Sequence, residues 1–162
     1  MRLILAFLAV LLSVPAFAAD WTSYENPRFG YELLIPPDYG PHGPPPENGD
    51  GQVFIRDDGT QLLRVYGGNL VDRDFRDAVG LAMDAATERG WSLSYKRVTQ
   101  RWASYSGTRD GMILYARAIT LCRGTQFASF EIEYPASDLD AMHSVIERMV
   151  PSLKATGDGL DC

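Results

Sequence analysis

The sequence predicts an α+β fold, an antiparallel sheet of six to seven strands flanked by helices in an α/β/α sandwich. Three observations predict it. Several strand-like runs follow one another along the chain. Short turns rich in Gly and Asp join many of these runs, which favours antiparallel pairing. Two longer segments carry apolar residues at helical spacing, and each must pack its apolar face against the sheet.

The amino end has the three parts of a secretory signal peptide over residues 1–18. Arg2 supplies a positive charge, Leu3 to Val14 is an apolar run, and Ala16 and Ala18 are the small residues that a signal peptidase reads. The run is too short for a bilayer-spanning helix, which needs roughly 20 residues. We therefore expect cleavage after Ala18 and a periplasmic or secreted protein without membrane insertion.

The rest of the chain has the length of one domain. We expect a single α+β domain over residues 19–155 and a short tail over residues 156–162. Loss of Arg2 makes the mature chain slightly more acidic than the net charge of −6 of the full sequence. Nucleic acids and anionic lipid surfaces repel such a protein. The expected partner is therefore an unknown protein or small ligand of the cell envelope.

Turn signals place the strands of the amino-terminal half. Gly30–Ile35 is a predicted strand that ends at two prolines, which have no amide hydrogen for a ladder. Pro36–Gly51 is rich in Pro and Gly and predicts a long irregular loop. Gly51–Arg56 and Gln61–Tyr66 flank an Asp-Gly turn, which predicts a hairpin.

Apolar spacing predicts two helices. The first runs from about Arg73 to Arg89, with Asp72 or Asp74 as its amino-terminal cap. The second follows Pro135 and runs to about Val150, before Pro151.

Four strand-like runs lie between the two helices. One of them, Met112–Cys122, is apolar at nearly every position as far as Leu121, which predicts a central strand covered on both faces. The two helices should then lie on opposite sides of the sheet. The other three runs are Trp91–Gln100, Trp102–Gly107 and Gln126–Tyr134.

The chain has two cysteines, Cys122 and Cys162. Outside the cytoplasm a disulfide is the default state of such a pair. A bridge within the chain would tie the tail to the domain. The alternative is that Cys162, at the chain end, links two chains, and the sequence leaves the distance between the two cysteines open.

Residues suited to catalysis or metal binding are sparse. The serine motif G-x-S-x-G is absent, and His42 and His143 are the two histidines that could act as bases. His143 and Glu147 stand four residues apart on the second helix, with Asp140 one turn earlier, but we favour local charge pairs on a solvated face over a zinc site.

Acidic residues also crowd one end of the first hairpin, where a calcium ion could bind. Their spacing does not match a calcium-binding loop, and turn chemistry explains the Asp-Gly pair, so we expect no metal and no cofactor. These residues are Glu47, Asp50, Asp57 and Asp58.

The proline-rich loop is the best candidate for a partner-binding element, because a long irregular segment in a small domain is often functional. Its candidate residues are Tyr39, His42, Pro44, Pro45 and Pro46, of which the three prolines form a stiff ridge. The alternative is a surface excursion without a role. Trp102 and Tyr105 could form an aromatic floor, but aromatic residues in strands more often serve core or cross-strand packing.

Four short motifs stand out along the chain: Asn26-Pro-Arg-Phe-Gly-Tyr31, Asn48-Gly-Asp-Gly-Gln52, Tyr105-Ser-Gly107 and Tyr134-Pro135. With these motifs the chain resembles a group of small exported bacterial proteins that is similar in fold to the PsbP-like family. The founding member of that family is an extrinsic subunit of the photosystem II oxygen-evolving complex. The resemblance covers most of the mature chain and implies a six-to-seven-stranded antiparallel sheet between helices and a non-catalytic role; it carries over no functional residues.

These observations favour an exported, non-enzymatic binding or accessory protein. The alternative is a periplasmic hydrolase with a scattered active site. A cleft in which His42 or His143 contacts both a carboxylate and a hydroxyl would favour the hydrolase, and a flat face with exposed aromatic residues would favour binding.

Overall fold

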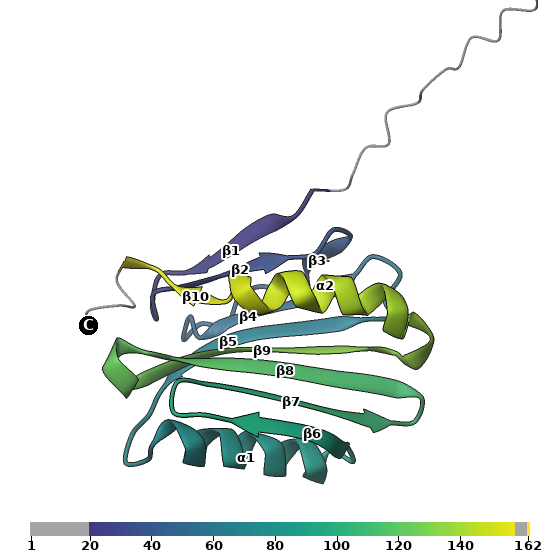
Figure 1. Ribbon diagram of the computed structural model, residues 1–162. Helices are drawn as coiled ribbons and strands as arrows, with labels where there is room; N and C mark the ends of the chain where they lie inside the picture. The colour runs from purple at the N-terminus through teal and green to yellow at the C-terminus, as the bar shows by residue number, and fades with distance from the viewer. Residues whose placement is uncertain (1–19, 158–161) are drawn as a thin grey trace, which may run out of the picture.

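The computed structural model describes residues 20–157 and residue 162, so the expected signal peptide lies outside the described residues. The described residues form a large sheet, a small sheet and two α-helices (Figure 1). The helices are α1 (Phe75–Glu88) and α2 (Leu139–Ser152). The small sheet contains β1 (Thr22–Asn26), β2 (Tyr31–Ile35) and β10 (Lys154–Ala155). The large sheet contains β3 (Tyr39–Pro41), β4 (Gly51–Arg56), β5 (Leu62–Asn69), β6 (Ser92–Val98), β7 (Trp102–Arg109), β8 (Met112–Leu121) and β9 (Gln126–Pro135).

Both sheets are antiparallel. The seven strands of the large sheet have the spatial order β3-β4-β5-β9-β8-β7-β6, and those of the small sheet the order β1-β2-β10. The predicted α+β class and the seven-stranded sheet are therefore confirmed.

The small sheet includes two strands that the sequence analysis missed. β1 is polar and mostly exposed, and β10 has only two residues, so neither carries a strand signal. Both pair with β2, whose Tyr31, Leu33 and Ile35 are fully buried. In the small sheet, β2 thus supplies the apolar side chains, while β1 and β10 contribute mainly backbone hydrogen bonds.

The sequence predicted an irregular loop over the whole proline-rich segment, but part of this segment is a strand. Tyr39–Pro41 forms the edge strand β3, which pairs with β4. An edge is where a sheet tolerates proline, because the missing amide hydrogen faces away from the ladder. β4 and β5 form the predicted hairpin, and Gly59 adopts the positive φ of 73° in its turn.

The central strand of the large sheet is β9, and the prediction that Met112–Leu121 is covered on both faces is wrong. β9 lies between β5 and β8, and its residues from Ala128 to Tyr134 are all buried. Along β8 the buried and half-buried side chains mostly alternate. One face of β8 lies under α1, whereas the opposite face is only partly covered.

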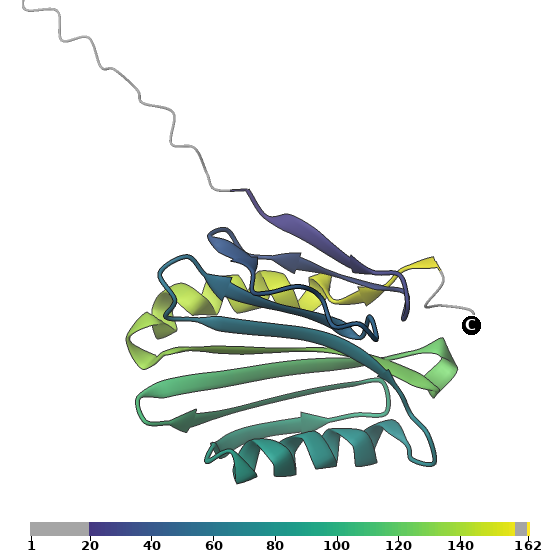
Figure 2. The same ribbon diagram turned by 180° about the vertical axis from the view of Figure 1, so that it is seen from behind.

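The two helices lie on opposite faces of the large sheet, as predicted. Phe130 and Ile132 of β9 belong to the core that α2 covers, whereas Phe127 packs with the core under α1. Neighbouring side chains along a strand point to opposite faces, so this separation places the helices on the two sides. Figures 1 and 2 both show α2 near the small sheet and α1 beside β6, at the other end of the large sheet.

Local chemistry fixes the helix ends. The Asp74 carboxylate accepts a hydrogen bond of 2.9 Å from the Asp77 amide, so Asp74 and not Asp72 is the cap of α1. α2 continues through Pro151 to Ser152, two residues beyond the predicted end. None of the described helices is long and apolar enough to cross a membrane.

Candidate functional site

The α2 side of β6, β7 and β8 carries aromatic and basic side chains on a partly open face. The strand register arranges them in two rows that cross the three strands. One row is Tyr95, Ser106 and Tyr115, and the other, two residues along each strand, is Arg97, Ser104 and Arg117. We call these six residues and Trp102 the β7 trough.

The middle strand of the trough is largely covered by side chains of its neighbours, since Ser104 is only 3% exposed. β7 contributes the short side chains of Ser104 and Ser106 to the two rows, while β6 and β8 contribute tyrosines and arginines. Ser104 Oγ accepts hydrogen bonds of 3.2 Å from the Tyr115 hydroxyl and from Nη1 of Arg117. Tyr95 on the outer wall is 45% exposed.

Trp102 closes one end of the trough and holds its two arginines. The guanidinium carbons of Arg117 and Arg97 lie 4.3 and 5.3 Å from the centre of its ring. The Nε of Arg117 is buried and has no hydrogen-bond partner among the described residues. This partial burial lowers the pKa of the Arg117 guanidinium below its usual value.

A groove between α2 and the sheet continues from the trough, and Tyr115 belongs to both. The groove has a volume of about 410 Å³ and mostly apolar walls. Leu139, at the start of α2, is 51% exposed beside it. We call this hollow the α2 groove; it is lined by Tyr115, Tyr134, Leu139, His143, Ile146, Glu147 and Val150.

Trp102 and Tyr105 do not form the common aromatic floor that the sequence suggested. They are three residues apart on one strand and therefore point to opposite faces of the sheet. Tyr105 is buried under α1, where its hydroxyl donates a hydrogen bond of 2.8 Å to Glu131. Burial raises the pKa of Tyr105 far above its ordinary value.

Two buried carboxylates on the α1 side of β9 are fully engaged. Glu131 accepts from Arg89 at 3.2 Å as well as from Tyr105, and Glu133 accepts from Arg64 at 2.5 Å. Buried charges require such partners. The two arginines and Tyr105 therefore supply the partners that these two buried carboxylates of the sheet require.

The structure separates the five residues of the candidate loop into two groups. Tyr39 is half-buried, and its hydroxyl donates to Gln61, which in turn donates to Asp138 at 2.7 Å. His42 and the three prolines, Pro44, Pro45 and Pro46, are exposed. Tyr39 thus belongs to the structural part of the domain, and a partner could reach only the exposed part of the loop without rearrangement.

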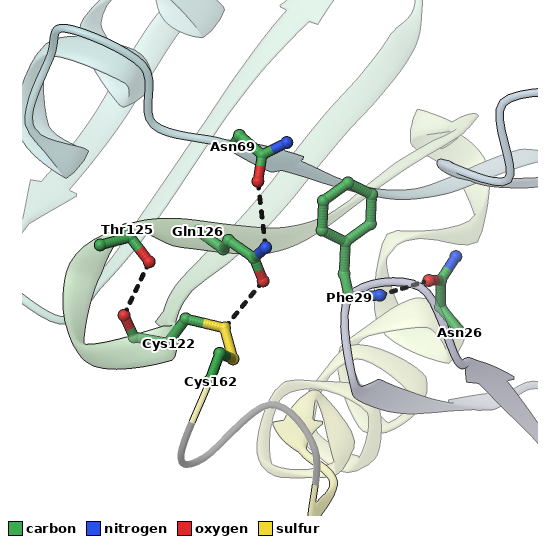
Figure 3. Close-up of a disulfide and its surroundings, with 7 residues drawn as sticks. All are labelled: Asn26, Phe29, Asn69, Cys122, Thr125, Gln126 and Cys162. Carbon is green, nitrogen blue, oxygen red and sulfur yellow. Dashed lines mark hydrogen bonds between the residues drawn. A yellow bond between two sulfur atoms is a disulfide. The ribbon is translucent and has the colours of Figure 1, made fainter.

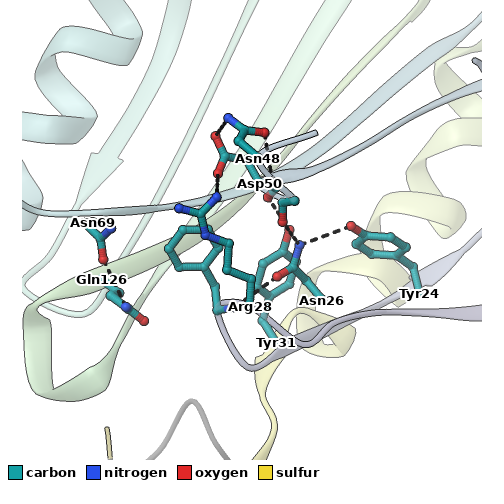
Figure 4. A network of polar contacts seen from close by, with 10 residues as sticks. Tyr24, Asn26, Arg28, Tyr31, Asn48, Asp50, Asn69 and Gln126 are labelled. Atoms are coloured by element: carbon teal, nitrogen blue, oxygen red, sulfur yellow. Dashed lines mark hydrogen bonds and ion pairs between the residues drawn. The ribbon is translucent and has the colours of Figure 1, made fainter. Parts of the chain in front are cut away.

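Two of the motifs behind the family resemblance meet at the base of this loop (Figure 4). Asn26 donates a hydrogen bond of 2.9 Å to the carbonyl of Gly49, and Arg28 pairs with Asp50 at 3.0 Å. The Tyr31 hydroxyl donates to the carbonyl of Asp50 at 3.2 Å. These contacts join the loop to the small sheet, so the motifs have a structural role here.

Cys122 and Cys162 form a disulfide within the chain, with Cα atoms 5.0 Å apart (Figure 3). Of the two alternatives that the sequence left open, the structure contains the intrachain bridge. Cys122 is buried directly after β8, and its sulfur lies 2.8 Å from Oε1 of Gln126. The bridge joins the chain end to the edge of the sheet where β8 turns into β9.

The histidines and acidic residues considered for catalysis or metal binding do not converge. His143 pairs with Glu147 at 3.3 Å, and both side chains are highly exposed. Within residues 20–157 and 162, no three His, Cys, Asp or Glu side chains are placed to hold a metal ion. At the hairpin, Asp58 accepts hydrogen bonds from the backbone and side chain of Thr60, which lower its pKa and cap the turn.

Sequence reasoning missed most of the trough, although the residues themselves were visible. Tyr95, Arg97, Tyr115 and Arg117 lie in two strands that are not consecutive along the chain, and only the pairing with β7 brings them together. The signal available in the sequence was alternation within each strand. A predicted register for the β6-β7-β8 meander would have been needed to use it.

No family model and no curated protein sequence matches the chain. Among solved structures, cyanobacterial PsbP from Synechocystis is similar with a TM-score of 0.65 and 16% identity, over 88% of this chain and 96% of that one. The Ran-binding protein Mog1p of Saccharomyces cerevisiae is similar with a TM-score of 0.62 and 13% identity, over 90% of this chain and all of that one. The chain therefore has the Mog1/PsbP fold.

Proposed function

We propose that this chain is an exported, non-enzymatic binding or accessory protein whose protein partner docks on the β7 trough and the α2 groove. The fold supports a binding role, since Mog1p, a structural neighbour, is a Ran-binding protein. Export rests on the signal-peptide pattern of residues 1–18.

The observation that carries the proposal is the clustering of exposed apolar and basic side chains on one open face. Four large hydrophobic residues are exposed in the described part of the chain, and two of them, Tyr95 and Leu139, belong to this surface. Trp102 lies on the same face of the sheet, with Arg97 and Arg117 against its ring. Aromatic residues and arginine are enriched at protein interfaces and dominate their binding energy.

The hydrolase alternative gains no comparable support. His143 contacts the Glu147 carboxylate, but no hydroxyl group of the described residues hydrogen-bonds to either histidine side chain. The exposed loop residues remain a predicted second contact, since Pro44, Pro45 and Pro46 lie at the surface.

Capture of the partner from the cell envelope tests which surface binds. We expect the double variant Tyr95→Ser, Leu139→Ser to recover the partner at least tenfold less efficiently than wild type, because truncating a tyrosine that is a hot spot of an interface costs about 2 kcal/mol or more. The matched control is Val71→Ser, Leu81→Ser, which removes the two other exposed large hydrophobic residues.

A third variant, with Pro44, Pro45 and Pro46 replaced by serine, tests the loop as a contact. The proposal predicts that the control double variant captures as wild type does. Undiminished capture by Tyr95→Ser, Leu139→Ser would contradict the proposal, and loss with the loop variant alone would assign binding to the loop.

A further inference from the structure

We propose that the β7 trough binds an acidic polypeptide segment in extended conformation, lying along β7 with its carboxylates on the arginines. This inference rests on the proposed function and names the partner chemistry of the same surface. It follows from the charge around Trp102, from how Trp102 holds the arginines, and from the spacing of the rows.

Positive charge is concentrated around Trp102 in a chain that is acidic as a whole, with a net charge of −6. Arg97 and Arg117 contact its ring, while Arg76 and Arg101 line an open polar hollow beside it. None of these four arginines forms an ion pair with a carboxylate of the described residues. Elsewhere in the described residues, Arg28, Arg56, Arg64, Arg89 and Arg109 each pair with one. Arg73 and Arg148 do not, and Arg148 stands alone over Trp21, so the surroundings of Trp102 are distinguished by the gathering of four such arginines.

Trp102 prepares two of these arginines for a ligand. A guanidinium held over an aromatic ring keeps N–H groups at its edge available to donate, so it can still bind a carboxylate. The hydrogen bond from Nη1 of Arg117 to Ser104 further fixes its position. Ordering these side chains in advance reduces the entropy that binding would otherwise cost.

The spacing of the trough matches an extended polypeptide. Its tyrosine row and its arginine row lie two residues apart along each strand. Side chains on one face of an extended chain also recur every two residues, at about 6.6–6.8 Å. A segment lying over β7 can therefore place an apolar side chain on Tyr95 and Tyr115 and the next same-face carboxylate on the guanidinium groups of Arg97 and Arg117.

Tryptophan indole resonances give a direct readout. The chain has three tryptophans, and Trp91 is buried under α1 while Trp21 contacts Arg148, away from the trough. We expect titration of the nitrogen-15-labelled protein with an acidic peptide to shift the indole signal of Trp102 saturably and to leave the other two in place. The probe is an eight-residue peptide of the sequence Leu-Leu-Glu-Glu-Leu-Leu-Glu-Glu. In an extended chain, leucine and glutamate then alternate on each face. The control peptide has lysine in place of each glutamate.

Charge removal tests the arginines. The double variant Arg97→Gln, Arg101→Gln changes two exposed side chains and should weaken binding of the acidic probe at least tenfold. The matched control Arg148→Gln, Lys154→Gln also removes two positive charges, from a different surface hollow. It should bind the probe as wild type does.

Three outcomes would overturn the inference: an unshifted Trp102 signal, equal affinity for the lysine peptide, or unchanged affinity of Arg97→Gln, Arg101→Gln. Tighter binding of heparin or of anionic phospholipid vesicles at the same residues would also overturn it, in favour of a non-peptide polyanion. If the acidic probe fails while partner capture still depends on Tyr95 and Leu139, the partner chemistry is wrong and the proposed function stands.

Discussion

Replacement of Phe130 by alanine is expected to lower the free energy of unfolding by about 3–5 kcal/mol, the usual cost of removing a buried phenylalanine. Phe130 is fully buried on the central strand β9, within the core that α2 and β2 cover. The measurement is urea unfolding followed by circular dichroism.

Phe127→Ala is the matched control, since it removes the same side chain from the same strand where it is half-buried. We expect a clearly smaller loss for it. Because a domain has only about 5–15 kcal/mol of stability, Phe130→Leu provides a milder change should the alanine variant not fold. Equal losses at Phe130 and Phe127 would contradict the assignment of β9 as the central buried strand.

Loss of the disulfide should have an effect of similar size. The bridge between Cys122 and Cys162 spans 40 residues, and closing such a loop in the unfolded chain stabilises the folded state by about 4 kcal/mol. Cys162→Ser is the suitable variant, because Cys162 is exposed and Cys122 is buried. We expect its urea midpoint to fall to that of the reduced wild-type protein.

Mass spectrometry of the unreduced monomer tests directly whether the disulfide is present. A mass two hydrogens lower than that of the reduced chain is expected. Two free thiols, or a Cys162→Ser variant as stable as the oxidised wild type, would contradict the intrachain bridge.

The strand and helix pattern was predictable because most elements carry their own signals. The Asp-Gly turn, the Asp74 cap and the apolar stripes of both helices are local features, and the structure bears them out. β1 and β10 were missed because their residues are polar or too few, and pairing with β2 alone makes them strands. Tertiary contacts decide such segments.

The error over the central strand has a different cause. β8 is apolar at almost every position, but Tyr115, Arg117 and Ile119 are half-buried and line or flank the trough. The continuous apolar sequence of β8 therefore belongs to two different faces. One face lies in the core under α1, and the other is the partly open face on the α2 side. The sequence did not indicate that β9 is the central strand, because β9 contains the charged residues Glu131 and Glu133. Both are nevertheless buried, each with an arginine partner.

Site-specific photo-cross-linking in intact cells tests most directly that a protein partner docks on this surface. A photoreactive amino acid replaces Tyr95 in the trough, Pro45 in the loop or, as the control, Leu81, which is as exposed as Tyr95 and lies on α1. The account predicts a discrete cross-linked product of higher mass from position 95 and none from position 81. Absence of a product at position 95, together with one at position 81 or at Pro45 of the loop, would contradict it.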